Sequence, residues 1–290
     1  MSNQKFGYTL IIPAIVIIVT IAFFPIVRCI WLSLYENDIL GGVGTRFIGL
    51  ENYKDLLGDK LFHKSFFNTL FFTVISVTCE FLLGLIFALL LDQSFRGRGI
   101  ARACVLIPWA LPPAIIAMAW RWIFNDTYGV FGDILMKTGI VHSPIAWLGK
   151  PGLAMFSVIF ADVWKTTPFI CIILLAGLQS IPRDLFEAIS IDGANSIRRF
   201  TMITLPLLRP YIVLALIFRT IQAFGVFDLV WVLTGGGPAG STQTVSLYIY
   251  DMSFRYLNLG YGSAITIVVF FILFVTAMMV TILGRGQTEY

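Results

Sequence analysis

The chain has 290 residues, of which 58% are hydrophobic and only 12% carry a charged side chain, and its net charge is +4. Soluble domains average about 25% charged residues, so this composition excludes a water-soluble fold. The small positive charge needs no nucleic-acid partner, because a Lys/Arg excess in cytoplasmic loops is usual for membrane proteins. The four cysteines lie inside apolar stretches without metal-site spacing and are expected to pack as small buried residues.

Six apolar runs are long enough to cross a bilayer, which takes about 20 residues per helix. They are Leu10–Leu34, Phe66–Leu91, Ile100–Phe124, Leu153–Gln179, Leu207–Leu233 and Tyr261–Leu283. The first run is too long for a signal peptide and lacks a cleavage site, so it is expected to be retained. Because an open sheet leaves backbone amides unpaired in lipid, the runs predict helices. The sequence therefore predicts an all-α integral membrane protein, with six transmembrane helices in a single permease domain over residues 1–290.

Arginines gather in two of the loops between these runs. They are Arg96, Arg98 and Arg102 after the second run, and Arg183, Arg198, Arg199 and Arg209 around the fourth-to-fifth connection. The loops on the other side mix acidic residues with lysines. The Arg-rich side is expected to be cytoplasmic, which places both termini in the cytoplasm of a bacterial or archaeal cell. Five tryptophans would then form a belt at the outer interface: Trp31, Trp120, Trp122, Trp147 and Trp231.

Residues 181–206 form a polar, charge-rich loop between two apolar runs. Pro182 suits the first turn of a short helix, and Gly193 suits a left-handed stop at its end. Asn195 is placed to cap a second short helix, and Pro206 is expected to end that helix and turn the chain back into the membrane. Two short helices exposing Glu187, Asp192 and Arg198 suit docking into a soluble partner.

The same stretch has two other interpretations. It is compatible with an ordinary solvated loop. Ala188 and Gly193 also fit the spacing of a DNA-binding helix-turn-helix loosely, but both ends of the stretch enter the bilayer within a few residues.

The loop resembles the E-A-A-x3-G-x9-I-x-L-P motif of ABC importer permeases. Matching residues, with every spacing kept, are Glu187, Ala188, Gly193, Ile203, Leu205 and Pro206. Ile189 departs from the motif's second alanine. The segments "EAISIDGA", "ITLPLLRP", "LIPWALPPAI" and "LTGGGP" further resemble the maltose-type carbohydrate branch.

The resemblance implies a permease subunit, not an enzyme, in an ATP-driven sugar importer. Its implied partners are a second permease subunit, two ATPase subunits and an extracytoplasmic solute-binding protein. In the family this loop is the coupling helix that seats in the ATPase, so the resemblance assigns coupling to Glu187, Ala188, Asp192, Gly193, Arg198 and Pro206. ATP and magnesium would bind the partner ATPase, since this chain has no G-x4-G-K-[ST] phosphate loop and no expected cofactor of its own.

Ionisable and polar residues inside the apolar runs mark a candidate substrate pathway, because such residues are costly in lipid. The candidates are Lys165, Thr166, Phe169, Arg219, Gln222 and Asp228. Asp228 reaches the face of Arg219 only if the helix breaks at Gly225. Phe224 and Phe227 would add aromatic faces for a sugar ring. Buried ion pairs, Glu80 with Arg219 and Asp162 with Lys165, are the competing structural interpretation.

Motif segments "WKTTPF" and "FRTIQAFGVFD" resemble the trehalose/maltose-type members and indicate an α-linked disaccharide. An anionic glycerol or sugar derivative remains an alternative, because Lys165 and Arg219 can clamp a phosphate or sulfonate. A less favoured alternative is an ion-coupled secondary transporter with Glu80, Asp162 and Asp228 as relays; its inverted repeats are not evident. An integral-membrane enzyme is disfavoured because no nucleophile or histidine cluster converges at one membrane face.

Overall fold

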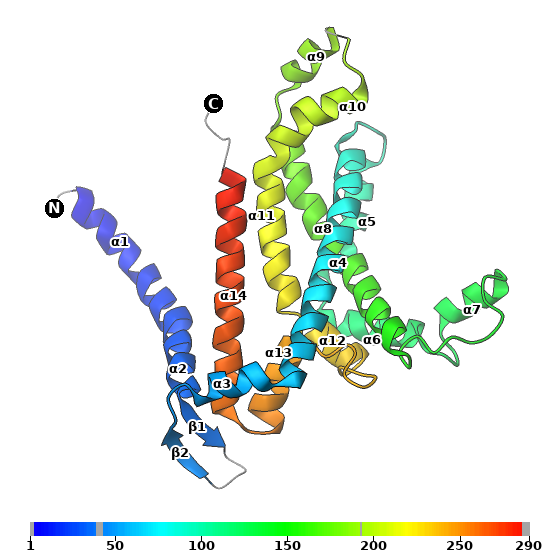
Figure 1. Ribbon diagram of the computed structural model, residues 1–290. Coiled ribbons are helices and arrows are strands. Elements are labelled where there is room, and N and C mark those ends of the chain that lie inside the picture. Colours follow the sequence, from blue (N-terminus) through cyan, green and yellow to red (C-terminus); the bar gives the residue numbers. More distant parts are fainter. Residues whose placement is uncertain (1–2, 39–42, 192, 286–290) are drawn as a thin grey trace. The chain divides into compact units, whose positions relative to one another are not determined.

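The computed structural model describes residues 3–38, 43–191 and 193–285, and helices make up most of it (Figure 1). Backbone contacts divide the chain into two compact units. One comprises residues 1–62 and 248–275, and the other comprises residues 63–247 and 276–290.

Within the described ranges, five helical stretches are long and apolar enough to cross a membrane. They are Ile11–Ser33, Lys60–Asp92, Pro151–Ser180, Ser196–Phe224 and Leu259–Ile282, and one bent helix pair brings the number to six. Large apolar side chains such as Phe71, Leu82 and Phe274 are exposed on these helices. Exposed apolar surface of this extent is stable when lipid covers it, which agrees with the predicted all-α membrane fold.

The third expected span is not one continuous helix. It consists of α5 (Arg98–Ala110) and α6 (Pro113–Ile123), which meet at 92°. Leu111 and Pro112 between them are extended, with ψ of 143° and 137°. The cause is the Pro112–Pro113 pair, because a proline disfavours helical geometry in the residue before it and offers no N–H.

The fifth expected span begins earlier and ends earlier than the hydropathy predicts. The chain is helical from α10 (Ser196–Arg199) through a π-helical turn, η2 (Phe200–Thr204), into α11 (Leu205–Phe224). The expectation that Pro206 ends a helix is therefore wrong. Pro206 directly follows η2, and the wider π-helical turn lets the helix continue past a residue that has no N–H. The helix instead ends at Phe224, and Asp228–Leu233 forms a separate short helix, α12.

The second unit is organised around α8 (Pro151–Ser180), α11 and α4 (Lys60–Asp92). Its apolar core is contributed by these three helices and the residue that follows α8: Ala88, Leu91, Ile170, Cys171, Leu174, Leu178, Ile181, Leu208 and Ala215. Two glycines let the helices approach closely. A Cβ on Gly84 would lie 2.9 Å from Ile170, and one on Gly177 would lie 2.6 Å from Tyr211. Small residues at such contacts are typical of membrane helix packing.

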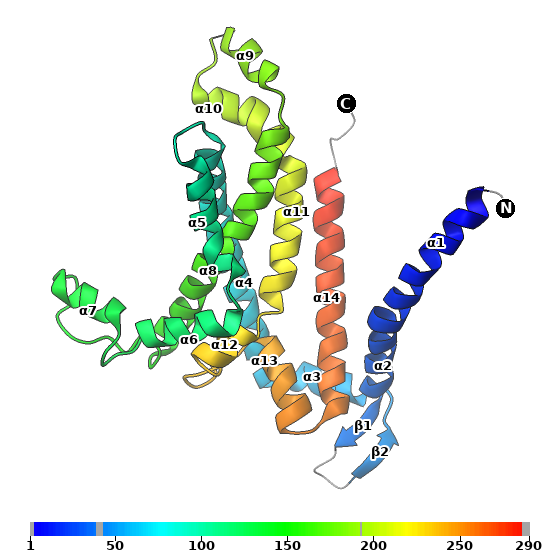
Figure 2. The same cartoon turned by 180° about the vertical axis from the view of Figure 1, so that it is seen from behind.

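Helices α8 and α11 lie side by side in both views (Figures 1 and 2). At one end of this pair are α9 (Arg183–Ile191) and α10, and at the other end are α6 and α12. Helices α8 and α11 thus connect the two ends of the second unit.

Aromatic packing near α7 (Val130–Lys137) corrects the predicted tryptophan belt. Trp147 is 7% exposed, and its ring lies 5.0 Å from that of Phe131 and 6.0 Å from that of Phe124. It therefore packs inside the protein, whereas Trp31 and Trp122 are exposed as a belt requires.

The first unit contains the ends of several helices and a small hairpin. Its elements are α1 (Asn3–Ile18), η1 (Val19–Phe23), α2 (Phe24–Ser33), β1 (Tyr35–Asp38), β2 (Val43–Phe47), α3 (Glu51–Gly58), η3 (Asp251–Arg255) and most of α14 (Leu259–Arg285). The last residues of α13 (Val245–Tyr250) also belong to it. Strands β1 and β2 pair antiparallel, with Tyr35 opposite Phe47 and Glu36 opposite Arg46.

Asp59 is a structural junction of this unit. Its Oδ1 accepts hydrogen bonds from the backbone N–H groups of Leu61 and Phe62, at 2.8 and 3.2 Å. Its Oδ2 accepts from the hydroxyls of Tyr248 and Tyr261, at 2.5 and 2.6 Å. Burial acts to raise the pKa of Asp59, but these hydrogen bonds outweigh it and lower the pKa.

Replacing this carboxylate should destabilise the unit. We expect Asp59→Asn to lower the free energy of unfolding by about 1–3 kcal/mol at neutral pH, because an amide cannot accept four hydrogen bonds. The measurement is thermal unfolding of the purified complex, with Asp55→Asn, an exposed carboxylate on α3, as the control.

The same pair of proteins gives a pH test. A carboxyl with a lowered folded pKa stabilises fully above its unfolded pKa of about 3.9 and loses this contribution as pH falls through the folded value. The gap between wild type and Asp59→Asn should therefore close in strong acid. A gap that is constant over the whole pH range would contradict this role.

Candidate functional site

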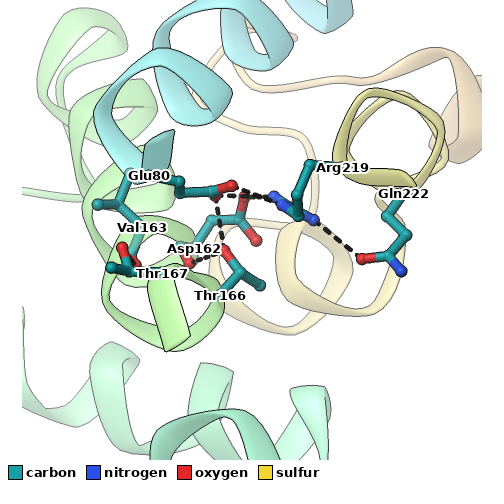
Figure 3. A network of polar contacts seen from close by, with 7 residues as sticks. All are labelled: Glu80, Asp162, Val163, Thr166, Thr167, Arg219 and Gln222. Atoms are coloured by element: carbon teal, nitrogen blue, oxygen red, sulfur yellow. Dashed lines mark hydrogen bonds and ion pairs between the residues drawn. The ribbon is translucent and has the colours of Figure 1, made fainter. Parts of the chain in front are cut away.

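A buried ion cluster joins the three central helices of the second unit (Figure 3). Arg219 of α11 donates from Nε to Glu80 Oε2 at 2.5 Å and from Nη2 to Glu80 Oε1 at 2.7 Å. The Nη2 group also donates to Asp162 Oδ2 of α8 at 3.0 Å. One guanidinium thus ties α4 to α8 and α11.

Each of these charges is almost fully removed from solvent. The side chains are 3% exposed for Arg219, 0% for Glu80 and 8% for Asp162. A buried charge is tolerated only when it is paired and hydrogen-bonded, and the bidentate Glu80–Arg219 contact meets that condition. The Glu80–Arg219 ion pair is therefore present, as one interpretation of the sequence held.

The expected Asp162–Lys165 ion pair is not found among the described salt bridges. Asp162 pairs with Arg219 instead, because the guanidinium of Arg219 extends from α11 and donates an N–H from Nη2 to Asp162 Oδ2. Lys165 is half-buried.

Thr166 and Gln222 extend the cluster. The Thr166 hydroxyl lies 2.6 Å from Glu80 Oε1 and 2.5 Å from the carbonyl oxygen of Asp162. Gln222, one turn after Arg219, has its Oε1 3.4 Å from Arg219 Nη1. Figure 3 shows Gln222 on the side of the guanidinium away from Glu80. The Thr166 hydroxyl is therefore engaged within the protein, whereas Gln222 is exposed.

A cavity of about 210 Å³ lies beside this cluster, at the middle of α8. Five of the six pathway candidates line it: Lys165, Thr166, Arg219, Gln222 and Asp228. Asp228 reaches the cavity because α11 ends at Phe224 and the chain turns at Gly225, as the sequence suggested. The structure thus brings these polar residues together, and Asp162 joins them.

The aromatic lining agrees with the sequence expectation at Phe227 but not at Phe169 or Phe224. Trp109 and Phe227 line the cavity. Phe169 instead packs against Trp109, with ring centroids 5.8 Å apart, and Phe224 is buried against Phe66. Sequence reasoning missed Trp109, which lies between Pro108 and the Pro112–Pro113 pair. The 92° bend brings the start of α6, Pro113, to the same cavity.

The predicted coupling loop has the expected turn. Gly193 has φ of +75°, the left-handed conformation that ends a helix. Asn195 Oδ1 accepts a hydrogen bond from the backbone N–H of Arg198 at 2.9 Å and so caps α10. Asp192, assigned to the same surface, lies outside the described residues.

Most of the other residues assigned to coupling are exposed. Glu187 and Ala188 are exposed on α9, and Arg198 is exposed on α10. Pro206 is exposed at the start of α11. These residues therefore form an accessible surface, which we call the loop surface, on the connection between α8 and α11.

The cavity has the chemistry of a binding site for hydroxyl groups. Gln222 offers both a donor and an acceptor, Lys165 offers donors, and Asp228 offers acceptors. Trp109 and Phe227 add flat apolar faces. Such a mixture suits a ligand whose surface alternates hydroxyls with apolar ring faces.

Comparison with known proteins places the chain among transport components. It is 45% identical over 290 residues to the trehalose/maltose transport system permease protein MalF of Thermococcus litoralis, with 99% of this chain and 96% of that protein covered. It is 40% identical over 270 residues to the sulfoquinovosyl glycerol transport system permease protein SmoG of Agrobacterium fabrum, with coverage of 93% and 87%.

The fold is also similar to a solved structure. A chain of a bacterial ABC transporter involved in the import of the acidic polysaccharide alginate matches with a TM-score of 0.83 and 22% identity, over 99% of this chain and 97% of that chain. At this identity the match concerns the fold alone.

Residues 80–289 match the model of the family described as binding-protein-dependent transport system inner membrane component. The matched segment contains α8, α11, the cavity and the loop surface. The chain therefore belongs to this family of inner-membrane transport components, as a multi-pass permease and not an enzyme.

Proposed function

We propose that this chain is the permease subunit of an ATP-driven sugar importer that passes a disaccharide of the trehalose/maltose type into the cytoplasm. The observation that carries the proposal is the polar and aromatic cavity at the middle of α8, inside an otherwise apolar bundle. The 45% identity to a trehalose/maltose permease supports the same substrate class.

The second candidate substrate is an anionic sugar or glycerol derivative. It is supported by Lys165 and Arg219 at the cavity and by the sulfoquinovosyl glycerol relative. Both candidates use the same permease and the same cavity, and they differ in whether a fixed positive charge is available to the substrate.

The proposed importer complex contains further subunits. A second permease subunit would complete the pathway, and an external solute-binding protein would deliver the sugar. Two ATPase subunits would bind ATP and magnesium. In this proposal the loop surface docks into one ATPase subunit, so that movement of that subunit reaches α8 and α11 through the α9–α10 connection.

The proposed orientation puts the loop surface and both termini in the cytoplasm. It is supported by the arginines near α9 and α10 and by those between α4 and α5. Ser143, which precedes α8, would face the outside.

The orientation is tested by labelling single cysteines. In a background without Cys29, Cys79, Cys104 and Cys171, we expect Ser143→Cys to react with an impermeant thiol reagent in intact cells. Ser196→Cys should react only after the membrane is permeabilised, because the two sites flank α8 on opposite sides. Labelling of Ser196→Cys in intact cells would overturn both the orientation and the docking proposal.

Docking is tested at Gly193 and Glu187. A Cβ at Gly193 meets no atom within 4 Å, so Gly193→Val acts through its backbone, where φ of +75° costs a β-branched residue about 1–2 kcal/mol. We expect Gly193→Val and Glu187→Lys to insert normally but to lose substrate-stimulated ATP hydrolysis in the reconstituted complex.

Matched controls separate docking from general damage. Gly193→Asn should keep most of the stimulation, since asparagine tolerates the left-handed conformation. Asp184→Lys places the same charge change on α9 outside the assigned residues. Full stimulation in a Gly193→Val, Glu187→Lys double variant would refute the docking role.

The cavity is tested at Gln222. We expect Gln222→Leu to reduce disaccharide uptake roughly ten- to hundredfold, because leaving substrate hydroxyls unpaired costs about 1–3 kcal/mol. Basal ATP hydrolysis and complex assembly should remain at wild-type levels. The control is Thr220→Val, on the same helix but outside the cavity lining. Equal uptake by Gln222→Leu and wild type would remove Gln222 from the pathway.

A further inference from the structure

Arg219 has little hydrogen-bonding capacity left for a substrate. A guanidinium has five N–H donors arranged along two edges, and each edge can bind a carboxylate, phosphate or sulfate with two parallel bonds. Glu80 occupies the Nε–Nη2 edge with both of its oxygens, at 2.5 and 2.7 Å. That edge is therefore closed to any oxyanion.

The other edge is also engaged. Asp162 Oδ2 accepts from Nη2 at 3.0 Å, and Gln222 Oε1 lies 3.4 Å from Nη1. The Gln222 contact is long and weak, so the available donor capacity lies at Nη1, on the side where Gln222 is exposed. A single N–H beside a glutamine amide matches a hydroxyl group, which accepts one bond and donates one.

The charges around the cavity also disfavour an anionic substrate. Glu80 and Asp162 place two carboxylates on one guanidinium that is 3% exposed. At the lining, Lys165 is accompanied by Asp228. An anionic substrate would therefore meet no uncompensated positive charge, and it would lose its hydration on entering.

We propose that Glu80 and Asp162 are specificity-determining positioning residues, which occupy both edges of Arg219 so that the cavity accepts neutral hydroxylated substrates and excludes oxyanions. This inference rests on the proposed function for the location of the substrate site. It decides between the two substrate classes in favour of the neutral sugar. It also predicts that removing one carboxylate converts Arg219 into an anion-binding group.

The test uses inorganic sulfate as the probe, with potassium chloride at equal ionic strength as the reference. The complete complex is reconstituted in proteoliposomes with its binding protein and ATP, and trehalose uptake is measured against sulfate concentration. For Asp162→Ala we expect half-maximal inhibition at a sulfate concentration at least about tenfold lower than for wild type, because a charged hydrogen-bonding edge is opened.

Asp228→Ala is the matched control. It removes the same charge and the same side chain from the same cavity but opens no edge of Arg219, so any sulfate sensitivity that it gains through Lys165 should be smaller than that of Asp162→Ala and should persist when Arg219→Gln is added. Adding Arg219→Gln to Asp162→Ala should abolish the acquired sensitivity. A merely structural role for Asp162 would lower stability or uptake without creating sulfate inhibition.

Two results would overturn the inference. One is equal sulfate sensitivity of Asp162→Ala and wild type, and the other is equal sensitivity of Asp162→Ala and Asp228→Ala, which would leave only a net-charge effect. If Asp162→Ala does not assemble, Glu80→Ala carries the same test at the Nε–Nη2 edge.

A second measurement separates this inference from the proposed function. Sulfate-dependent thermal stabilisation of the purified complex is compared between the variants and wild type, and it requires no transport. Failure of the wild-type complex to import trehalose or maltose would refute the proposed substrate, whereas absence of stabilisation in both Asp162→Ala and Glu80→Ala would refute the role of the carboxylates.

Discussion

One guanidinium holds the three main helices of the second unit together. Arg219 brings a permanent charge into a bundle whose outer surface is apolar, and that charge is tolerated only because Glu80 and Asp162 reach it from two other helices. Removing one partner of such a buried pair typically costs about 3–5 kcal/mol. The relative register of α4, α8 and α11 is thereby fixed at one height, and the cavity forms beside that point.

The same helices connect the cavity to the loop surface. Helix α8 runs from the cavity to Ser180, and only Ile181 and Pro182 separate it from α9. Between them lies the apolar core, where Gly84 and Gly177 allow close helix contact. Close-packed protein interiors have low compressibility and transmit a displacement. In the proposed importer, movement imposed on α9 would therefore reach the ion cluster as a shift of whole helices.

Much of this arrangement could be predicted from the sequence, where the signal was local. The turn at Gly193, the cap at Asn195 and the break at Gly225 each depend on one residue and its neighbours. The partner of Asp162 could not be predicted, because spacing along one helix favours Lys165 and the real partner comes from another helix. The prediction for Pro206 was wrong because the π-helical turn η2 lets the helix continue past this proline. Trp109 was missed because a pair of prolines predicts a break in a helix but not the angle between the two parts.

Residues on both sides of the α5–α6 bend line the cavity. Trp109 belongs to α5, and Pro113 is the first residue of α6. In an unbroken helix they would lie one turn apart on the same face, whereas the break at Leu111 and Pro112 lets two helices at 92° contribute to one lining. The cavity thereby combines the ring faces of Trp109 and Phe227 with the donors and acceptors of α8 and α11. A sugar ring has the same combination of apolar faces and a hydroxylated rim, so in the proposed importer the bend and the Arg219 cluster together form the recognition site.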